Sequence, residues 1–175
     1  MSAGFDLDSR LAGDTLEVGR TRLSRVLLMN EARFPWLILV PERRGISELF
    51  DLPGAEAHQL LDESLLLARL MAAPAMRWTL ATADAAAGAE PFTTAGATTI
   101  TATGGVGAEP FVKLNVASLG NVVAQLHLHH VLRTPGDAAW PGPVWGHGAR
   151  VPLERDRGDA LLRAWTVQLA PLLAL

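Results

Sequence analysis

Polar side chains able to do chemistry recur at every second position in one stretch of the chain, at Gln125, His127 and His129. The residues around them are mostly apolar or β-branched, which predicts a strand over about residues 122–132. Because side chains alternate along a strand, these three share one face, and the intervening leucines and His130 take the other. Imidazoles are costly to bury without partners, so the pattern indicates either a site backed by an apolar core or a solvated strand face.

A metal site is one reading of the same histidines. His127 and His129, together with His130 or His147, offer imidazole nitrogens of the kind that bind Zn²⁺. His130 is predicted on the opposite face, and the strand contains no carboxylate. We therefore expect neither a metal nor a cofactor.

The motif resembles that of a known family. The run Gln125-Leu126-His127-Leu128-His129-His130-Val131 is similar to the signature of the histidine-triad (HIT) superfamily of nucleotide hydrolases and transferases, with Gln125 in place of the first histidine. Further segments resemble the family in the same order along the chain: Leu28–Asn30, Pro35–Pro41, Leu49–Leu52, Asn115, Gly120-Asn121 and Trp140–Gly142.

The resemblance implies a fold and a reaction. The implied fold is α+β, a HIT-like antiparallel sheet of about five strands with one main helix, here followed by a C-terminal helix, and two such sheets join in a homodimer. The implied reaction occurs at the α-phosphate of a dinucleoside polyphosphate or a nucleoside phosphoramidate. His127 attacks and forms a phosphohistidine intermediate, and the backbone carbonyl of Gln125 fixes its tautomer.

The remaining site residues also follow from the resemblance. It implies that His129 binds phosphate oxygens and stabilises charge, while the Gln125 amide donates in place of an imidazole. Asn30 falls where the family binds ribose hydroxyls, and Asn115 lies close to the phosphates. Gly120 and Asn121 belong to the phosphate and ribose segment, although both also suit a plain turn.

Two departures support a second hypothesis, a nucleotide-binding module with little or no turnover. The first motif histidine is replaced by Gln125. Val122 falls where many family members carry a serine or threonine that assists the leaving group, and valine cannot form that hydrogen bond.

Length and composition set the broad class. The 175 residues suit a single domain, 1–175. The chain has no cysteine, and its net charge of −3 argues against a general nucleic-acid binder. No apolar run approaches the roughly 20 residues that span a bilayer, and the first residues do not resemble a secretory signal. We expect a cytoplasmic protein with a nucleotide substrate and no membrane or nucleic-acid partner.

Periodicity predicts the elements. We expect a short helix or turn within residues 5–14, strands at 15–18, 23–29, 36–40 and 113–116, and a hairpin turn at Gly19-Arg20. A helix over 53–71 is expected to carry its main stripe at Leu61, Leu65 and Ala68. Leu60, Leu67 and Met71 are expected to widen this stripe, and His58 is expected on the surface.

Two further segments complete the prediction. Residues 73–108 are rich in Ala, Thr and Gly, and we interpret them as an insertion. The Pro/Gly-rich tail carries Trp140 and Trp145, which cover either this sheet or a partner's, so the tail favours a homodimer. A last helix is expected within 158–174, from about Asp159 until Pro171 ends it.

Overall fold

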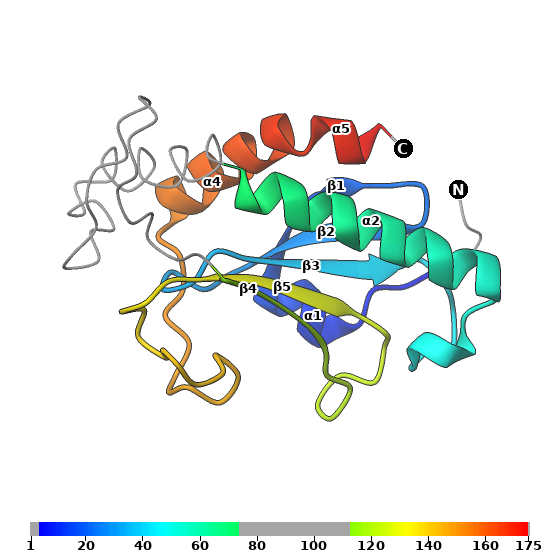
Figure 1. Cartoon of the computed structure of the whole chain (residues 1–175), viewed down its shortest axis with the longest axis horizontal. Coiled ribbons are helices and arrows are strands. Elements are labelled where there is room, and N and C mark those ends of the chain that lie inside the picture. Colours follow the sequence, from blue (N-terminus) through cyan, green and yellow to red (C-terminus); the bar gives the residue numbers. More distant parts are fainter. Residues whose placement is uncertain (1–3, 74–112, 175) are drawn as a thin grey trace, which may run out of the picture.

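The computed structural model describes residues 4–73 and 113–174, and among these the chain forms one five-stranded antiparallel sheet (Figure 1). The strand order is β1-β2-β3-β5-β4, which confirms the predicted α+β class. The predicted insertion lies almost wholly outside the described residues. The elements in chain order are α1 (Ser9–Asp14), β1 (Thr15–Arg20), β2 (Ser24–Met29), β3 (Trp36–Pro41), η1 (Leu49–Asp51), α2 (Gly54–Ala72), β4 (Lys113–Ser118), β5 (Leu128–Arg133), α4 (Arg155–Gln168) and α5 (Ala170–Leu173).

Both faces of the sheet are covered, which explains why all six residues of β3 are buried. On one face, α2 and the C-terminal helices α4 and α5 pack over apolar side chains (Figure 1). On the other face, a second cluster joins Leu11 of α1 to Trp36 and Ile38 of β3 and to Val144 of the tail. No helix among residues 4–73 and 113–174 is long and apolar enough to cross a bilayer.

The first hairpin turns two residues later than expected. Gly19 and Arg20 belong to β1, and the pairing register shifts between Glu17 and Gly19, so that one extra residue lies in β1. Such a bulge bends and twists the strand. A Cβ at Gly19 would lie 3.0 Å from the Leu173 side chain, so this glycine permits close packing of α5 and does not mark the turn. The prediction of a turn at Gly19-Arg20 was wrong.

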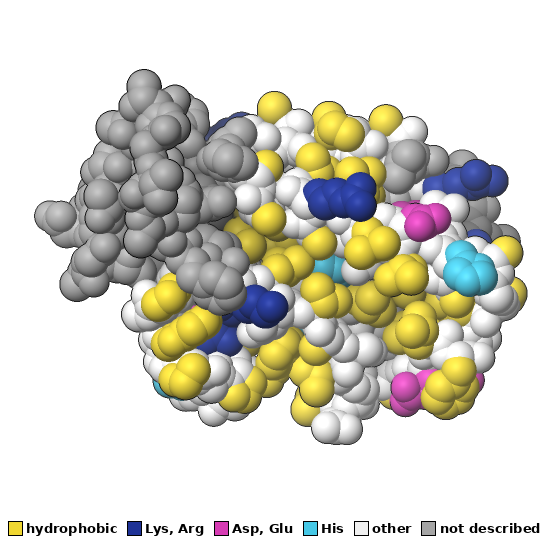
Figure 2. Space-filling model, in the orientation of Figure 1, with side chains coloured by type: hydrophobic (Ala, Val, Ile, Leu, Met, Phe, Trp, Pro, Cys, Tyr) yellow, Lys and Arg dark blue, Asp and Glu magenta, His cyan; other side chains and the backbone are white. Residues whose placement is uncertain are grey.

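Helix α2 has the predicted extent, but the centre of its buried face differs from the expected one. Leu61 and Leu65 are 53% and 48% exposed, and they contribute to the apolar surface on the α2 side of the molecule (Figure 2). The helix buries Leu60, Leu67 and Met71, which were expected to widen the stripe, together with Glu63 and Ser64. The centre of the buried face was misplaced because two of the residues there, Glu63 and Ser64, are polar. Glu63 accepts hydrogen bonds from the Leu23 amide and the Ser24 hydroxyl, which compensates for its burial.

The C-terminal helix divides in two at the buried residue Leu169. Its first part, α4, packs closely on β1, where a Cβ at Gly158 would lie 3.5 Å from Leu16. Pro171 does not end the helical region as predicted, because it lies in the first turn of α5, where a missing amide donor costs little. The helices therefore cover the β1 end of the sheet.

A buried ion pair joins β5 to the tail. Arg133 Nε lies 2.6 Å from Asp137 Oδ2, its Nη2 donates to Oδ1, and both side chains are only 2% exposed. Burial by itself would raise the pKa of Asp137, but hydrogen bonds from Arg133 and the Ala139 amide hold that pKa below its usual value. Arg133 Nη1 also donates to Asn115 Oδ1 at 3.0 Å and so links the pair to β4.

Removing the Asp137 carboxylate should leave the Arg133 guanidinium buried without its counter-charge. We expect Asp137→Ala to lower the free energy of unfolding by roughly 3–5 kcal/mol, measured by urea denaturation. The matched control is Asp14→Ala, which breaks the exposed pair of Asp14 with Arg150 and should cost at most about 1 kcal/mol. Equal losses in the two variants would contradict this assignment.

Candidate active site

The histidine motif begins in a loop and ends in a strand. β5 starts at Leu128, so the strand predicted from residue 122 is shorter than expected, and residues 119–127 are irregular. Gly120 and Asn121 are exposed in this loop, which is an open bend and not the expected tight turn. The Leu126 amide donates to the Ile46 carbonyl, outside the sheet, and this contact competes with strand pairing at that point.

The predicted facing of the imidazoles is nevertheless correct for His127 and His129. Their ring centroids lie 4.6 Å apart in an edge-to-face arrangement, and both side chains are buried. His127 Nδ1 donates to the Gln125 carbonyl oxygen at 2.7 Å, as the family resemblance implied. In the neutral ring this bond places the proton on Nδ1, so Nε2 carries the lone pair that a nucleophile needs.

His129 has the opposite tautomer. The Trp36 indole Nε1–H donates to His129 Nδ1 at 2.9 Å, so the proton of the neutral ring lies on Nε2. Burial, together with the neighbouring charges of His127 and His130 when protonated, lowers the pKa of His129 from 6.5 to about 3. His129 is therefore neutral at physiological pH and offers a fixed N–H donor beside the lone pair of His127.

His130 faces the helical side of the sheet, as predicted. Its Nδ1 donates to the Leu128 carbonyl, and its Nε2 lies 2.8 Å from Ser64 Oγ of α2, which donates to it. Burial lowers the pKa of His130 to about 4, against the opposing effect of the Leu128 carbonyl. The residue joins β5 to α2 and lies outside the candidate site.

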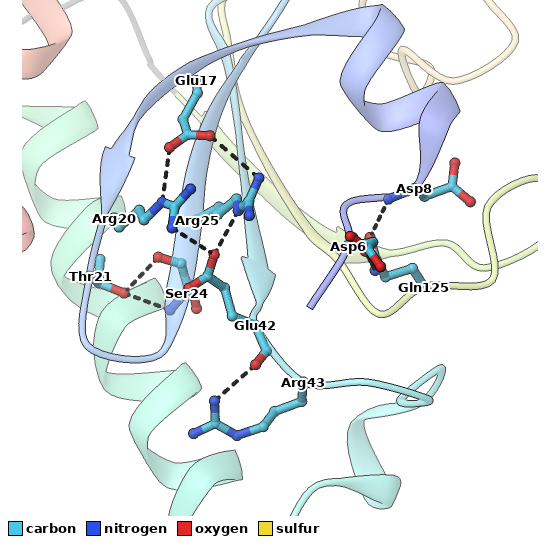
Figure 3. Close-up of polar contacts among 10 residues, drawn as sticks. All are labelled: Asp6, Asp8, Glu17, Arg20, Thr21, Ser24, Arg25, Glu42, Arg43 and Gln125. Carbon is cyan, nitrogen blue, oxygen red and sulfur yellow. Dashed lines mark hydrogen bonds and ion pairs between the residues drawn. The ribbon is translucent and has the colours of Figure 1, made fainter. Parts of the chain in front are cut away.

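The Gln125 side chain is engaged with the N-terminal segment. Its Oε1 accepts from the Asp8 amide at 3.0 Å, and its Nε2 donates to the Asp6 carbonyl at 2.9 Å (Figure 3). The structure thus brings the backbone of Gln125 to His127, while the carboxamide holds the N-terminal segment.

The two predicted asparagines have protein partners. Asn115 lies in β4 opposite Val131 and its Oδ1 accepts from Arg133, so its place is fixed on the face of the sheet that carries His129. Asn30 follows β2, and its Oδ1 accepts from the Leu153 amide at 2.8 Å. The described part of the chain contains no group of three or more His, Cys, Asp or Glu side chains arranged to hold a metal ion.

Sequence reasoning missed two tryptophans that build the site. The Trp36 and Trp145 rings lie 5.3 and 5.5 Å from the His129 ring, and Trp145 also contacts Trp36 at 5.7 Å. The tail thereby covers this chain's own sheet. A signal was present for Trp36, because an indole N–H in a buried strand requires an acceptor. The Trp145 indole nitrogen is buried and has no hydrogen-bond partner among the described residues.

Comparisons with known proteins agree with this arrangement. Residues 12–136 match the HIT domain family. The fold is similar to a histidine triad protein from Marinobacter aquaeolei VT8, with a TM-score of 0.68 and 38% identity over 97% of this chain and 96% of that one. A histidine triad protein from Sinorhizobium meliloti 1021 has a TM-score of 0.66 and 32% identity over 98% and 99% of the two chains.

A third structure, a histidine triad protein from Bradyrhizobium japonicum, has a TM-score of 0.62 and 29% identity over 97% of this chain and 98% of that one. No curated protein matches the chain. The two matches above 30% identity extend over nearly the full length of both chains, so the similarity is not confined to the histidine motif.

Burial of His129 and His130 should make stability fall on mild acidification. Both pKa values are lowered on folding, from 6.5 to about 3 and about 4, so the unfolded chain binds more protons below pH 6.5. The free energy of unfolding should therefore decrease as the pH falls from 6.5 toward 5, by up to about 1.4 kcal/mol per pH unit for each histidine. Urea denaturation at pH 7, 6 and 5 measures this slope.

The test compares how steeply the free energy of unfolding changes with pH in each variant, and not the absolute stability of the variants. His130→Gln should have a smaller slope than the parent chain, whereas His58→Gln, on the exposed side of α2, should keep it. An unchanged slope in His130→Gln would show that His130 does not titrate differently in the folded and unfolded states.

Proposed function

Because the chain belongs to the HIT domain family of nucleotide hydrolases and transferases, we propose that it cleaves a nucleoside phosphate at the α-phosphorus through a phosphohistidine. The substrate class is a dinucleoside polyphosphate or a nucleoside phosphoramidate. The observation that carries the proposal is the 2.7 Å hydrogen bond from His127 Nδ1 to the Gln125 carbonyl, which leaves Nε2 as the nucleophilic atom.

The reaction has two displacements at phosphorus. In the first, the lone pair of His127 Nε2 forms the N–P bond while the bond from phosphorus to the leaving group breaks, and the leaving group departs with that electron pair. The imidazole becomes cationic, and its Nδ1 proton stays hydrogen-bonded to the carbonyl. In the second, water attacks phosphorus, the N–P bond breaks, and the nucleoside monophosphate leaves after water loses a proton to solvent.

His129 supports this chemistry with a fixed donor. Its neutral ring holds the proton on Nε2 because the indole of Trp36 donates to Nδ1. A preorganised N–H aimed at phosphate oxygens stabilises the charge that develops in the transition state. We assign Asn115, Gly120 and Asn121 to the phosphate and ribose segment. Asn30 is assigned to the ribose through the part of its amide that Leu153 does not use.

The second candidate function is nucleotide binding with little turnover. It is supported by the two residues at which the chain departs from the family signature, Val122 and Gln125. The Val122 carbonyl accepts from Arg10, and its side chain is 73% exposed and offers no hydroxyl. The Gln125 amide is engaged with the N-terminal segment. Proton donation to the leaving group would then come from solvent, which favours substrates whose leaving groups need little assistance.

We also propose that the chain forms a homodimer through the edge of its sheet. β4 is the last strand in the order, so one of its sides has no neighbouring strand among the described elements. Val116 of β4 is 48% exposed. An exposed strand edge is a template for pairing with a second copy. Trp140 is 38% exposed and lies over the Arg133 guanidinium, which is compatible with a tail at the rim of such an interface.

The nucleophile can be tested by trapping the adduct. With a nucleoside phosphoramidate as substrate, we expect a mass increase of one nucleotidyl group on His127, detected by intact mass after a quench that avoids acid. His129→Ala should form this adduct more slowly, because the fixed donor is lost. His127→Gly should abolish turnover and still bind nucleotide.

His147→Ala serves as the control, because His147 is exposed in the tail and its variant should form the adduct normally. Normal turnover by His127→Gly, or an adduct on another residue, would exclude this mechanism. Nucleotide binding without any adduct in the parent chain would support the binding module.

The dimer can be tested by sedimentation at micromolar concentration, where the parent chain should have about twice its mass of 18.7 kDa. Val116→Lys should shift the equilibrium toward the monomer, because a charged residue on an edge strand opposes pairing. Val167→Lys, at a 72% exposed position on α4, is the matched control and should remain dimeric. A monomeric parent chain, or a fully dimeric Val116→Lys variant, would contradict the proposed interface.

A further inference from the structure

The N-terminal segment Asp6–Asp8 lies beside the histidine motif, where Leu7 packs against the core and the Gln125 side chain binds the backbone of Asp6 and Asp8. Gln125 accepts from the Asp8 amide with Oε1 and donates to the Asp6 carbonyl with Nε2, across more than a hundred positions of sequence (Figure 3). We propose that Gln125 is a positioning residue: through this clamp, the N-terminal segment fixes the Gln125 carbonyl that sets the tautomer of His127.

The loop needs such a clamp because no strand pairing holds it. Residues 119–127 precede β5 and have none of the regular ladder bonds that fix a strand peptide. Contacts from outside the sheet replace them at three places. Arg10 Nη1 donates to the Val122 carbonyl at 3.0 Å, the clamp holds Gln125, and the Leu126 amide donates to the Ile46 carbonyl. Two of the three contacts come from the N-terminal segment and α1.

The chemistry of a carboxamide matches the segment it meets. Asp8 presents an amide donor and Asp6 a carbonyl acceptor, and a primary amide is an acceptor and a donor at adjacent atoms. A carboxylate of the same shape would keep the first bond and lose the second, because it has no proton to donate. The segment is itself anchored, since Asp8 Oδ1 accepts from the Arg10 amide and caps α1.

The link to the candidate nucleophile passes through a single residue. The side chain of Gln125 holds the segment, and its carbonyl accepts from His127 Nδ1. If the peptide moves, the carbonyl no longer selects the Nδ1–H form, and part of the His127 population loses its lone pair at Nε2. The importance of that tautomer for catalysis rests on the proposed function, whereas the clamp and the tautomer are measurable without turnover.

Gln125→Glu tests the clamp with a substitution of equal shape. Long-range proton–nitrogen NMR spectra of the imidazoles should show His127 as the Nδ1–H form in the parent chain and as a mixture of both forms in the variant. Hydrogen exchange of the Asp8 amide should become roughly two- to tenfold faster in Gln125→Ala, the factor that corresponds to the loss of the hydrogen bond that this amide donates to Oε1. Gln125→Ala, which removes both bonds, should also show the mixture of His127 tautomers, and it provides the test if the glutamate variant fails to fold.

Gln168→Glu on α4 is the matched control, because it makes the same charge change at a distance from the loop, and both observables should equal those of the parent chain. An unchanged His127 tautomer in both Gln125 variants would overturn the proposal. With a phosphoramidate substrate, the Gln125 variants should lose kcat with little change in KM. A changed tautomer in a chain that never turns over would sustain the clamp and refute the proposed function.

Discussion

The hydrogen bond between His127 Nδ1 and the Gln125 carbonyl is the contact on which the proposed chemistry of this chain depends. An imidazole is a nucleophile only at a nitrogen without a proton, and the hydrogen bond made by the other nitrogen determines which nitrogen that is. A backbone carbonyl performs this task with any side chain at that position. The departure from the family signature at Gln125 is therefore compatible with a nucleophilic His127, provided that the loop holds the carbonyl in place.

The other two motif histidines are fixed by different partners, and their surroundings separate their functions. His129 accepts from the Trp36 indole on one face of the sheet, while His130 donates to the Leu128 carbonyl and accepts from Ser64 on the other. Burial lowers both pKa values far enough to keep the rings neutral. On the candidate-site face this gives a lone pair on the neutral His127 ring beside an N–H on His129.

The sequence predicted the elements and the facing of the histidines because those features follow from short periodic patterns. It failed where long-range packing decides the outcome. Leu61 and Leu65 were assigned to the core because they are apolar, but Glu63 and Ser64 occupy it through hydrogen bonds to residues distant in sequence. Gly19 was read as a turn because glycine favours turns, whereas it lies in a strand under Leu173. No local pattern contains those partners.

The same limit explains why the site was only partly predictable. Spacing and resemblance placed His127, His129 and the Gln125 carbonyl, all within five residues of one another. The partner of His129, in contrast, comes from β3, and the partner of the Gln125 amide comes from the first residues of the chain. A carboxamide beside two imidazoles was naturally interpreted as a ligand for phosphate. In the structure its acceptor and donor already have backbone partners, so Gln125 contributes to the site through the position of its peptide group.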